Sequence, residues 1–394
     1  MATTKRHALV FGASGVTGWA VVKQLLLDYP AAGTWGEVTA LTNRPLTLEL
    51  SQWPETGKLS IVSGLNLLEQ SQEAFNGAIK DKIPNIDTVT HVFYYAYKAN
   101  PNFEQEKQDA VDMLVRAVTA VDQLSPVLQF VAFQTGAKVA NPFMYGFLLQ
   151  EDHYLPVPLK ESLPRLKPPF SDQLFYHAQL DWLDSYAKGK SWTWCETRPD
   201  IVVGFAPNHS AYSLAASLAI YFSLWRDING PSSVVPFPGT MKSWKAKHND
   251  AGSEMIGKQT IFLSLHPEIS GQGEAFNVAT SSQCSSWEEK WPLLCEYFGL
   301  KSEPPSDHSR EVRAYINDNM SRWKELERKY NLRDDIAQSG ITMPGFEILH
   351  LILADFDRQY DMSKIYDAGF REDYSVMDIW GKTWDEMRTA KMIP

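Results

Sequence analysis

A turn of three glycines near the start of the chain limits its folding more than any other feature of the sequence. The turn, residues 12–18, follows an apolar run at residues 8–11 and precedes an apolar-periodic stretch at residues 16–28. In a strand–turn–helix unit, the first glycine permits the tight turn, the second lets a pyrophosphate approach the backbone, and the third allows close packing of the helix. The N–H groups at the helix start then face the anion. This order predicts dinucleotide contacts from Gly12, Ser14, Gly15, Val16, Thr17 and Gly18.

The alternative is a glycine-rich turn that binds nothing. The turn lies between a strand pattern and a helix pattern, which is the context that a dinucleotide-binding motif requires. This context favours the interpretation that the turn binds a dinucleotide.

The N-terminal half alternates apolar runs with amphipathic stretches. This pattern is typical of a parallel sheet with helices on both faces. The expected strands are residues 8–11, 38–42, 59–63, 90–95, 129–134 and 193–197. The clearest helices are residues 16–28, 104–124 and 171–187. We therefore predict an α/β fold with a Rossmann-type doubly wound parallel sheet.

The character of the sequence changes after Arg198-Pro199. Pro, Gly, Ser and Trp become frequent at residues 208–243, and helical patterns dominate from residue 311 onwards. Two apolar runs, residues 260–265 and 274–278, resemble strands that return to the main sheet. These shifts predict two interleaved units. They are a Rossmann domain at 1–205, with 255–285 returning to it, and a smaller, mainly helical substrate lobe at 206–254 and 286–394.

Charge and cysteine content exclude several kinds of partner. A formal net charge of -10 over 394 residues would repel nucleic acid and anionic membranes. The first apolar run has no cleavage-site pattern, and no apolar run reaches the ~20 residues of a membrane span. Cys195, Cys284 and Cys295 have neither metal-ligand spacing nor a disulfide pattern. We expect a cytoplasmic protein with no metal, no nucleic acid partner and no membrane insertion, and a homodimer remains open.

The residues after the second strand indicate which dinucleotide binds. An NAD site usually places an acidic residue there to accept a hydrogen bond from the ribose 2′-OH, whereas this chain has Asn43 and Arg44. These two side chains suit a 2′-phosphate, so the predicted cofactor is NADP(H). The alternative is that Arg44 is an ordinary solvated cation.

Enzymes with such a turn often carry a catalytic Tyr and Lys four residues apart on one helix. Four pairs have this spacing, but each lies on a strand pattern, at a helix end or outside the sheet region, and we interpret them as coincidence. They are Tyr94/Lys98, Tyr186/Lys190, Tyr297/Lys301 and Tyr360/Lys364.

A different pair stands nearer the expected site. Lys138 comes just past the fifth strand, at the sheet edge where ligands of open α/β folds bind, and Tyr176 lies on the helix before the sixth strand. Lys138 could reach Tyr176 through space.

At these residues the chain resembles the progesterone 5β-reductase and iridoid synthase (PRISE) group of atypical extended short-chain dehydrogenases, over nearly its whole length. The matching segments are residues 12–18, 43–45, 91–94, 128–129, 134–136 with 138, 164–166, 175–176, 198–199, 204–205 with 207, 237–239, 274–277 and 391–394.

The resemblance implies an enzyme of secondary metabolism that transfers hydride from NADPH to the β-carbon of an activated alkene. It places Tyr176 and Lys138 at the carbonyl end as the catalytic residues. Negative charge builds on an enone oxygen during such a step, and a tyrosine donor beside an ammonium stabilises it. The further cofactor contacts that the resemblance implies are Leu65, Ala96, Tyr97, Lys138, Tyr176, Pro199, Val202 and His209.

The chain departs from the family pattern around this pair. Val139-Ala140 follow the lysine in place of His-Tyr, and His177 replaces a second tyrosine. Tyr97 stands where the family has tryptophan, and Gly64 stands where it has an acidic residue. These changes point to an altered pocket.

Apolar segments of the second lobe suggest the kind of substrate. Residues 346–353 could form a helix that covers the pocket, or an ordinary core helix. Phe237, Met241 and Trp244 are expected to line a hydrophobic site. The expected substrate is therefore a small hydrophobic carbonyl compound, such as a terpenoid, steroid or polyketide-like enone.

Two other functions remain open from the sequence. A carbonyl reductase or alcohol dehydrogenase would use the same tyrosine, with hydride reaching the carbonyl carbon. A regulator that senses NADP(H) would bind the cofactor without turnover. A cyclase that releases a reactive enolate is a further alternative.

Overall fold

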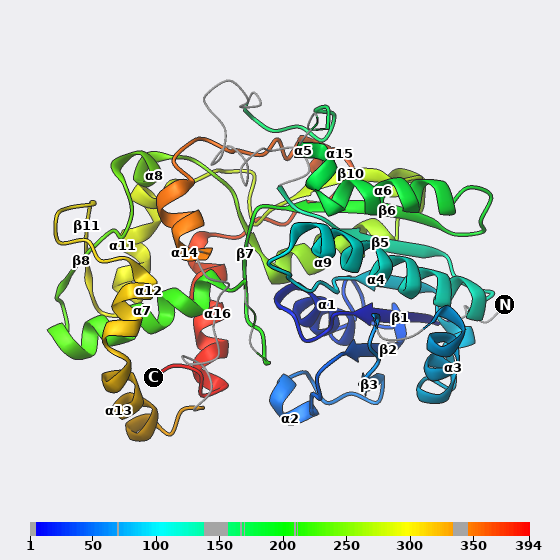
Figure 1. The fold of residues 1–394 in the computed structure, drawn as a ribbon, viewed down its shortest axis with the longest axis horizontal. Coiled ribbons are helices and arrows are strands. Elements are labelled where there is room, and N and C mark those ends of the chain that lie inside the picture. The colour runs from blue at the N-terminus through cyan, green and yellow to red at the C-terminus, as the bar shows by residue number, and fades with distance from the viewer. Residues whose placement is uncertain are drawn as a thin grey trace.

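A seven-stranded parallel sheet forms the centre of the protein (Figure 1). The computed structural model describes residues 5–68, 71–137, 157–165, 168, 170–208, 210, 212–333 and 346–394. The strand order is β3-β2-β1-β4-β5-β6-β10. The strands are β1 (Arg6–Phe11), β2 (Trp35–Thr42), β3 (Leu59–Ser63), β4 (His91–Tyr94), β5 (Phe130–Gln134), β6 (Thr193–Pro199) and β10 (Glu274–Val278). The predicted α/β doubly wound fold is confirmed.

The chain leaves β1 in one direction along the sheet and returns to its other side. β1 pairs with β2 on one edge and with β4 on the other, both in parallel. The strand order therefore reverses between β1 and β4. Ligands of open α/β sheets bind at such a switch point, outside the carboxyl ends of the strands.

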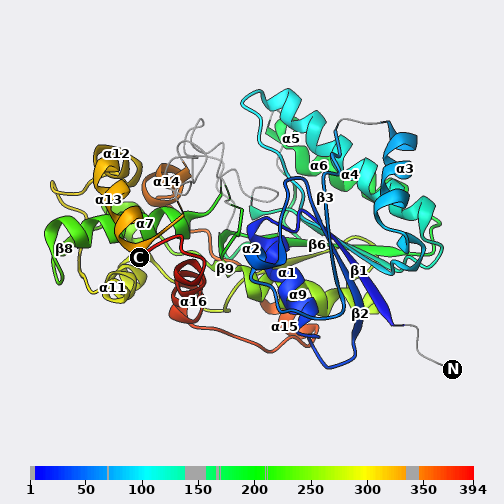
Figure 2. The same cartoon turned by 90° about the horizontal axis from the view of Figure 1, so that it is seen from below.

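Successive side chains of β1 point to opposite faces of the sheet, and both faces are buried. Ala8 and Val10 belong to one hydrophobic cluster, and Leu9 and Phe11 to a second. A strand buried on both faces is expected of a parallel sheet. Figure 2 shows the two helical layers. The first contains α1 (Val16–Leu26) and α9 (Ser253–Ser264), and the second contains α3 (Gln72–Lys82), α4 (Phe103–Leu124), α5 (Phe170–Gln173) and α6 (Phe175–Tyr186).

A second, mainly helical lobe lies beside the sheet, on the left of Figure 1. Its core is aromatic: the Phe222 ring centroid lies 4.9 Å from that of Trp291 and 6.2 Å from that of Trp384. These rings come from three different helices of the lobe. The helices of this lobe are α7 (Leu214–Asn229), α8 (Met241–Lys245), α11 (Trp287–Tyr297), α12 (Val312–Asp318), α13 (Met320–Tyr330), α14 (Phe346–Ile348), the π-helix η4 (Leu349–Leu353) and α16 (Val376–Thr389).

Short elements complete the fold. Two small parallel sheets pair β7 with β9 and β8 with β11. The remaining elements are α2 (Leu48–Ser51), η1 (Ile86–Thr88), β7 (Ile201–Val203), β8 (Val234–Pro236), β9 (Asp250–Gly252), α10 (Pro267–Ser270), β11 (Lys301–Glu303) and α15 (Ser363–Asp367). No helix in the described ranges is both long and apolar enough to cross a bilayer.

Of the two segments expected to return to the sheet as strands, one does and one does not. Residues 274–278 form β10, which pairs in parallel with β6 at the sheet edge. The strand prediction for 260–265 is wrong, because these residues lie at the end of helix α9. The end of α9 is a short continuous apolar run because the helix is buried against the sheet. Such a run is found in buried strands and in buried helices, so periodicity alone does not distinguish them.

The helix expected at residues 171–187 is interrupted. Leu174 adopts an extended conformation (φ -86°, ψ 108°) that separates α5 from α6. As a result, Phe175 and Tyr176 stand in the first turn of α6 instead of in the middle of a longer helix.

A fully buried group of charges holds the second lobe to β9. The Lys290 ammonium lies 2.6 Å from Asp250 Oδ1 and 2.6 Å from His248 Nε2. Trp380 donates to Asp250 Oδ2 at 2.8 Å. Burial, followed by the neighbouring Lys290 charge, holds the pKa of His248 well below its usual range, so the neutral imidazole can accept from lysine.

We predict that Lys290→Met lowers the free energy of unfolding by about 3–5 kcal/mol, because it leaves the Asp250 carboxylate buried without its counter-ion. Urea unfolding followed by circular dichroism measures this change. The matched control is Lys382→Met, which removes a half-exposed lysine paired with Glu254 and should cost under about 1 kcal/mol. Equal losses in the two variants would contradict the prediction.

Candidate active site

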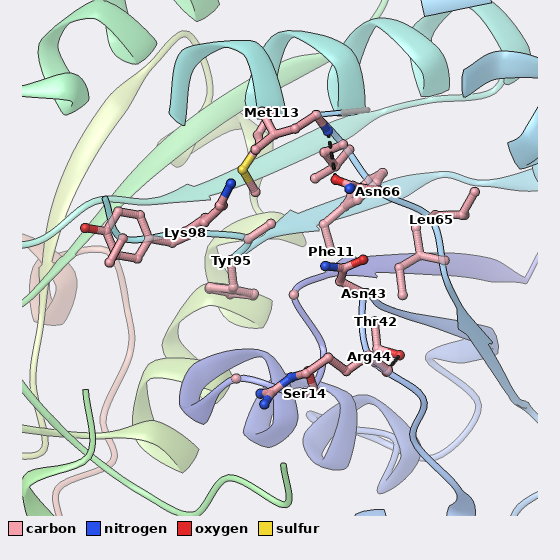
Figure 3. A pocket seen from close by; sticks show the side chains of 18 of the residues that line it. Phe11, Ser14, Thr42, Asn43, Arg44, Leu65, Asn66, Tyr95, Lys98 and Met113 are labelled. Atoms are coloured by element: carbon pink, nitrogen blue, oxygen red, sulfur yellow. Dashed lines mark hydrogen bonds between the residues drawn. The ribbon is translucent and has the colours of Figure 1, made fainter. Parts of the chain in front are cut away.

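Two adjacent cavities that share part of their lining open at the carboxyl ends of the sheet strands. The first has a volume of about 420 Å³ and is shown in Figure 3. The second has a volume of about 260 Å³. Residues common to both linings are Tyr95, Ala96, Tyr97, Ser210 and Tyr212. A long ligand such as a dinucleotide can therefore extend from one cavity into the other.

The glycine turn forms the floor of the first cavity, which Gly12, Ser14 and Gly15 line. Gly12 has a φ of 76°, and a Cβ built on it would lie 2.7 Å from the carbonyl carbon of Tyr95. Gly18 lies behind the turn, where its Cβ would be 2.3 Å from the Gly12 carbonyl oxygen. Gly15 caps α1 without any side-chain hydrogen bond to the helix start. The first N–H groups of α1 are thus left for an anion, and the cradle fits a pyrophosphate.

The described lining of the first cavity carries positive charge. Its charged lining residues are Arg44 and Lys98, which lie on opposite sides of the cavity in Figure 3, and none of its described lining residues is acidic. Asn43 and Leu65 also line it, and Lys98 pairs with Asp109 at 3.6 Å. Figure 3 shows the Arg44 side chain beside Ser14 at the start of α1. The Thr42 hydroxyl donates to the Arg44 carbonyl oxygen at 2.7 Å, which fixes the turn that carries the arginine.

The second cavity is mainly apolar, with a few polar groups. The predicted residues that line it are Val16, Thr17, Ala96, Tyr97, Tyr176, Pro199 and Val202. Phe346, Leu349 and His350 also line it, so the segment at 346–353 lies over the pocket. Lys138 and His209 lie outside the described residues, and their roles remain predictions.

Tyr176 lines the second cavity where three elements of the fold come together. Its hydroxyl lies 3.7 Å from the place that a Cβ on Gly136 would occupy, and the Pro199 carbonyl oxygen lies 3.6 Å from the same place. The end of β5, the end of β6 and the start of α6 therefore meet there. Phe175 packs against the tyrosine with tilted rings whose centroids are 4.3 Å apart, and Tyr97 stacks on Phe175 with centroids 5.3 Å apart.

Burial raises the pKa of the Tyr176 hydroxyl, and the nearby Tyr212, Glu106 and Glu196 add to the shift. A raised pKa means that the side chain is a neutral phenol at physiological pH. Tyr176 can therefore donate a hydrogen bond or a proton to a ligand oxygen in the cavity.

One set of predicted pocket residues is wrong. Phe237, Met241 and Trp244 line neither of these two cavities. Phe237 and Trp244 pack against each other in the aromatic core of the second lobe, with centroids 5.1 Å apart, and Met241 is 48% exposed. The aromatic residues of this stretch fill a core instead of a site, which is the commoner use of such side chains.

Several lining residues were not identified from the sequence. The Tyr212 and Tyr97 hydroxyls lie 3.3 Å apart where the two cavities meet, and the Tyr97 hydroxyl donates to Glu106. Gln134 and Gln179 line the second cavity. Tyr212 follows a stretch without helical or strand periodicity in its apolar residues, so no pattern in the sequence places it in the lining of the cavities. His177 is buried but lines neither cavity. The described residues contain no group of three or more His, Cys, Asp or Glu side chains that could hold a metal ion.

Solved structures with the same architecture share little sequence with this chain. A UDP-glucose 4-epimerase from Thermotoga maritima superposes with a TM-score of 0.61 at 11% identity, covering 97% of this chain and 99% of that chain. A UDP-glucose 4-epimerase from Thermus thermophilus, solved with NAD, gives a TM-score of 0.58 at 13% identity, with the same coverage of both chains. At these identities the likeness shows the fold alone.

Sequence relatives are closer. The short chain dehydrogenase ausT of Aspergillus calidoustus is 35% identical over 99% of this chain and 95% of its own length. An (S)-8-oxocitronellyl enol synthase of Nepeta racemosa is 26% identical over 75% of this chain and 68% of its own length. The family described as "PRISE-like Rossmann-fold domain" matches residues 8–394. The protein thus belongs to the PRISE-like family, and it is an NAD(P)-dependent reductase of the short-chain dehydrogenase type.

Proposed function

We propose that the protein is an NADPH-dependent reductase that delivers hydride to the β-carbon of an enone in a hydrophobic substrate. The observation that carries this proposal is the Tyr176 hydroxyl, a neutral donor in the lining of a mainly apolar cavity that adjoins the cavity over the glycine turn. This arrangement can hold a carbonyl oxygen at Tyr176 while the reacting carbon faces the nicotinamide end.

The charge of the first cavity supports NADPH over NADH. Arg44 and Lys98 are its only charged residues among the described lining, and Asn43 adds an amide. A 2′-phosphate would find a bidentate cationic donor in Arg44, whereas the described lining residues offer no carboxylate to the 2′-OH of NADH. The residues present therefore fit the phosphorylated cofactor.

The chain's own residues stabilise the charge that forms during reduction. NADPH, when bound, supplies the hydride. As negative charge grows on the substrate oxygen, the Tyr176 phenol donates to it, and the donation is stronger in the transition state than in the ground state. The apolar walls exclude water, and Tyr176 is poised to give its proton to the enolate oxygen. We propose that Lys138, just past β5, assists this donation as an ammonium.

The choice of C=C over C=O is supported by the relative named as an enol synthase. An enol is the product when hydride adds to the β-carbon of an enone and the oxygen takes a proton. Addition to the carbonyl carbon would give an alcohol instead. The direct test is to incubate the protein and NADPH with enones and with the matched saturated ketones. Saturation of the C=C supports the proposal, alcohol formation from ketones would replace it with a carbonyl reductase, and binding of NADPH without turnover would replace it with a sensor.

Removal of the Tyr176 hydroxyl tests its role as the donor. Tyr176→Phe should lower kcat for enone reduction by about 10²–10³, because one donor to the developing oxyanion is lost. The dissociation constant for NADPH, measured by quenching of tryptophan fluorescence, should change little.

The control for this variant is Tyr186→Phe, on the same helix. Its hydroxyl bonds to Asp122 at 2.8 Å and lines neither cavity, so kcat should stay near the wild-type value. Full activity of Tyr176→Phe would rule out the catalytic assignment.

Removal of the Arg44 side chain tests its role in cofactor choice. Arg44→Ala should weaken NADPH binding by about 10- to 100-fold, the range expected for losing a charged hydrogen bond to phosphate. NADH lacks this phosphate, so its affinity should change by less than about 3-fold. Titration of both cofactors against the same protein preparation measures the two effects. A parallel loss of NADH binding would show that Arg44 supports the fold of the site and does not select the phosphate.

A further inference from the structure

Strand β6 carries a buried ion pair close to the second cavity. Arg198 Nη2 lies 2.7 Å from Glu196 Oε2, and the two side chains are 12% and 2% exposed. The cost of removing both charges from water offsets most of their attraction, so such a pair is weak evidence of stability. Its position in the fold is therefore more informative than its strength.

The pair lies on the same side of the sheet as Tyr176. Successive side chains of a strand point to opposite faces. Cys195 belongs to the hydrophobic cluster that contains α1, whereas Trp194 belongs to the cluster against which Tyr176 packs. The Glu196 side chain therefore points to the same face as Trp194, toward the layer that contains Tyr176.

The other oxygen of the Glu196 carboxylate holds Thr135. The Thr135 hydroxyl donates to Glu196 Oε1 at 2.5 Å, and Thr135 is only 3% exposed. The Thr135 N–H also donates to the Thr197 carbonyl oxygen at 2.9 Å. Thr135 stands one residue past the end of β5. Strand β6 thus fixes this residue through both its backbone and its side chain.

Thr135 belongs to the part of the cavity wall that faces Tyr176. Gln134, Thr135 and Gly136 all line the second cavity. A Cβ on Gly136 would lie 3.7 Å from the Tyr176 hydroxyl, which is an ordinary van der Waals contact. A shift of this backbone would change the space beside the hydroxyl, where the carbonyl oxygen of a substrate has to lie.

Arg198 anchors the carboxylate from the opposite side. Arg198 Nη1 donates to the Glu161 carbonyl oxygen at 3.2 Å. The Glu161 carboxylate in turn accepts from the Asn277 N–H of β10 at 2.8 Å. A row of polar contacts therefore runs from Thr135 in the cavity wall, through Glu196 and Arg198, to the edge strand of the sheet. With a donor on each of its oxygens, the Glu196 carboxylate has little freedom to rotate.

We propose that Glu196 is a positioning residue for the reduction: through the Thr135 hydroxyl it holds residues 134–136 against Tyr176 and so sets where the substrate's carbonyl oxygen binds. This inference rests on the proposed function, in which Tyr176 donates to that oxygen. Glu196 itself lines neither cavity. A misplacement of about 1 Å at a reacting group can cost about 10²-fold in rate, so an anchor beside the donor affects turnover without touching the substrate.

Thr135→Val tests the proposal, because it removes the hydroxyl, keeps the shape of the side chain and leaves the ion pair in place. The full-length protein saturated with NADPH is mixed with substrate, and a single turnover is followed by NADPH fluorescence. The rate constant should fall by about 10- to 100-fold in Thr135→Val and stay within about 3-fold of the wild type in Thr135→Ser, which keeps the hydroxyl. A loss of folded protein alone would lower the amplitude and leave the rate constant unchanged.

Glu196→Gln tests the other partner of the same hydrogen bond. An amide has one acceptor oxygen, which should face the charged Arg198 and leave Thr135 without its acceptor. The double variant should be no slower than the slower single variant, because both changes break one interaction. Losses that multiply would overturn the proposal. If Glu196→Gln does not fold, the Val and Ser variants of Thr135 decide alone.

The matched control is Thr39→Val. The Thr39 hydroxyl lies 2.9 Å from His7 Nε2, and this fully buried residue of β2 lines neither cavity. Its single-turnover rate constant should equal that of the wild type. A wild-type rate constant in Thr135→Val, or an equal loss in Thr39→Val, would overturn the inference.

The choice of substrate separates this inference from the proposed function. The substrate is the enone or ketone that the wild type reduces fastest. If only ketones react, reduction of the C=C is contradicted, while the Thr135 variants still measure how the same carbonyl oxygen is positioned. If enones react and Thr135→Val is as fast as the wild type, the proposed function stands and the positioning role is wrong. Absence of turnover with every compound would overturn both.

Discussion

The close approach of helix α1 to the turn before it is the constraint on which the candidate site depends. A Cβ on Gly18 would lie 2.3 Å from the Gly12 carbonyl oxygen, and a Cβ on Gly12 would lie 2.7 Å from the backbone of Tyr95. Real Cβ atoms do not come so close, so only glycine allows both contacts. These contacts join the ends of β1 and β4. The residues after β4 then line both cavities, so the same packing aligns the cofactor end with the substrate end.

Burial raises the pKa of the Tyr176 hydroxyl, which makes the phenol a weaker acid. Its value as a donor therefore rests on its position, where the ends of β5 and β6 meet the start of α6 in the lining of the second cavity. The mainly apolar lining strengthens each hydrogen bond that a ligand makes inside the cavity.

Local patterns in the sequence predicted the sheet well, because residues that are close in the sequence determine where its strands and its first helix form. The strand at 38–42 and the glycine turn were found from periodicity and spacing alone. Residues 260–265 were misassigned because a short apolar run fits a buried helix as well as a strand. Tyr212 was not identified, because a loop residue reaches its place through contacts distant in sequence. Phe237 was misplaced for a related reason: an aromatic side chain does not reveal whether it lines a core or a pocket.

Contacts between distant segments decide where the second lobe stands relative to the glycine turn. A Cβ on Gly204, after β7, would lie 2.0 Å from Ser253 Oγ and 2.9 Å from Val16 at the start of α1. On the outer side of α1, Lys23 pairs with Glu386 of α16 at 2.5 Å. The helix that presents its N–H groups to the cofactor is therefore held by segments from the middle and the end of the chain. The ion pair between Lys23 and Glu386 thus connects the helix at the phosphate site to α16 of the second lobe.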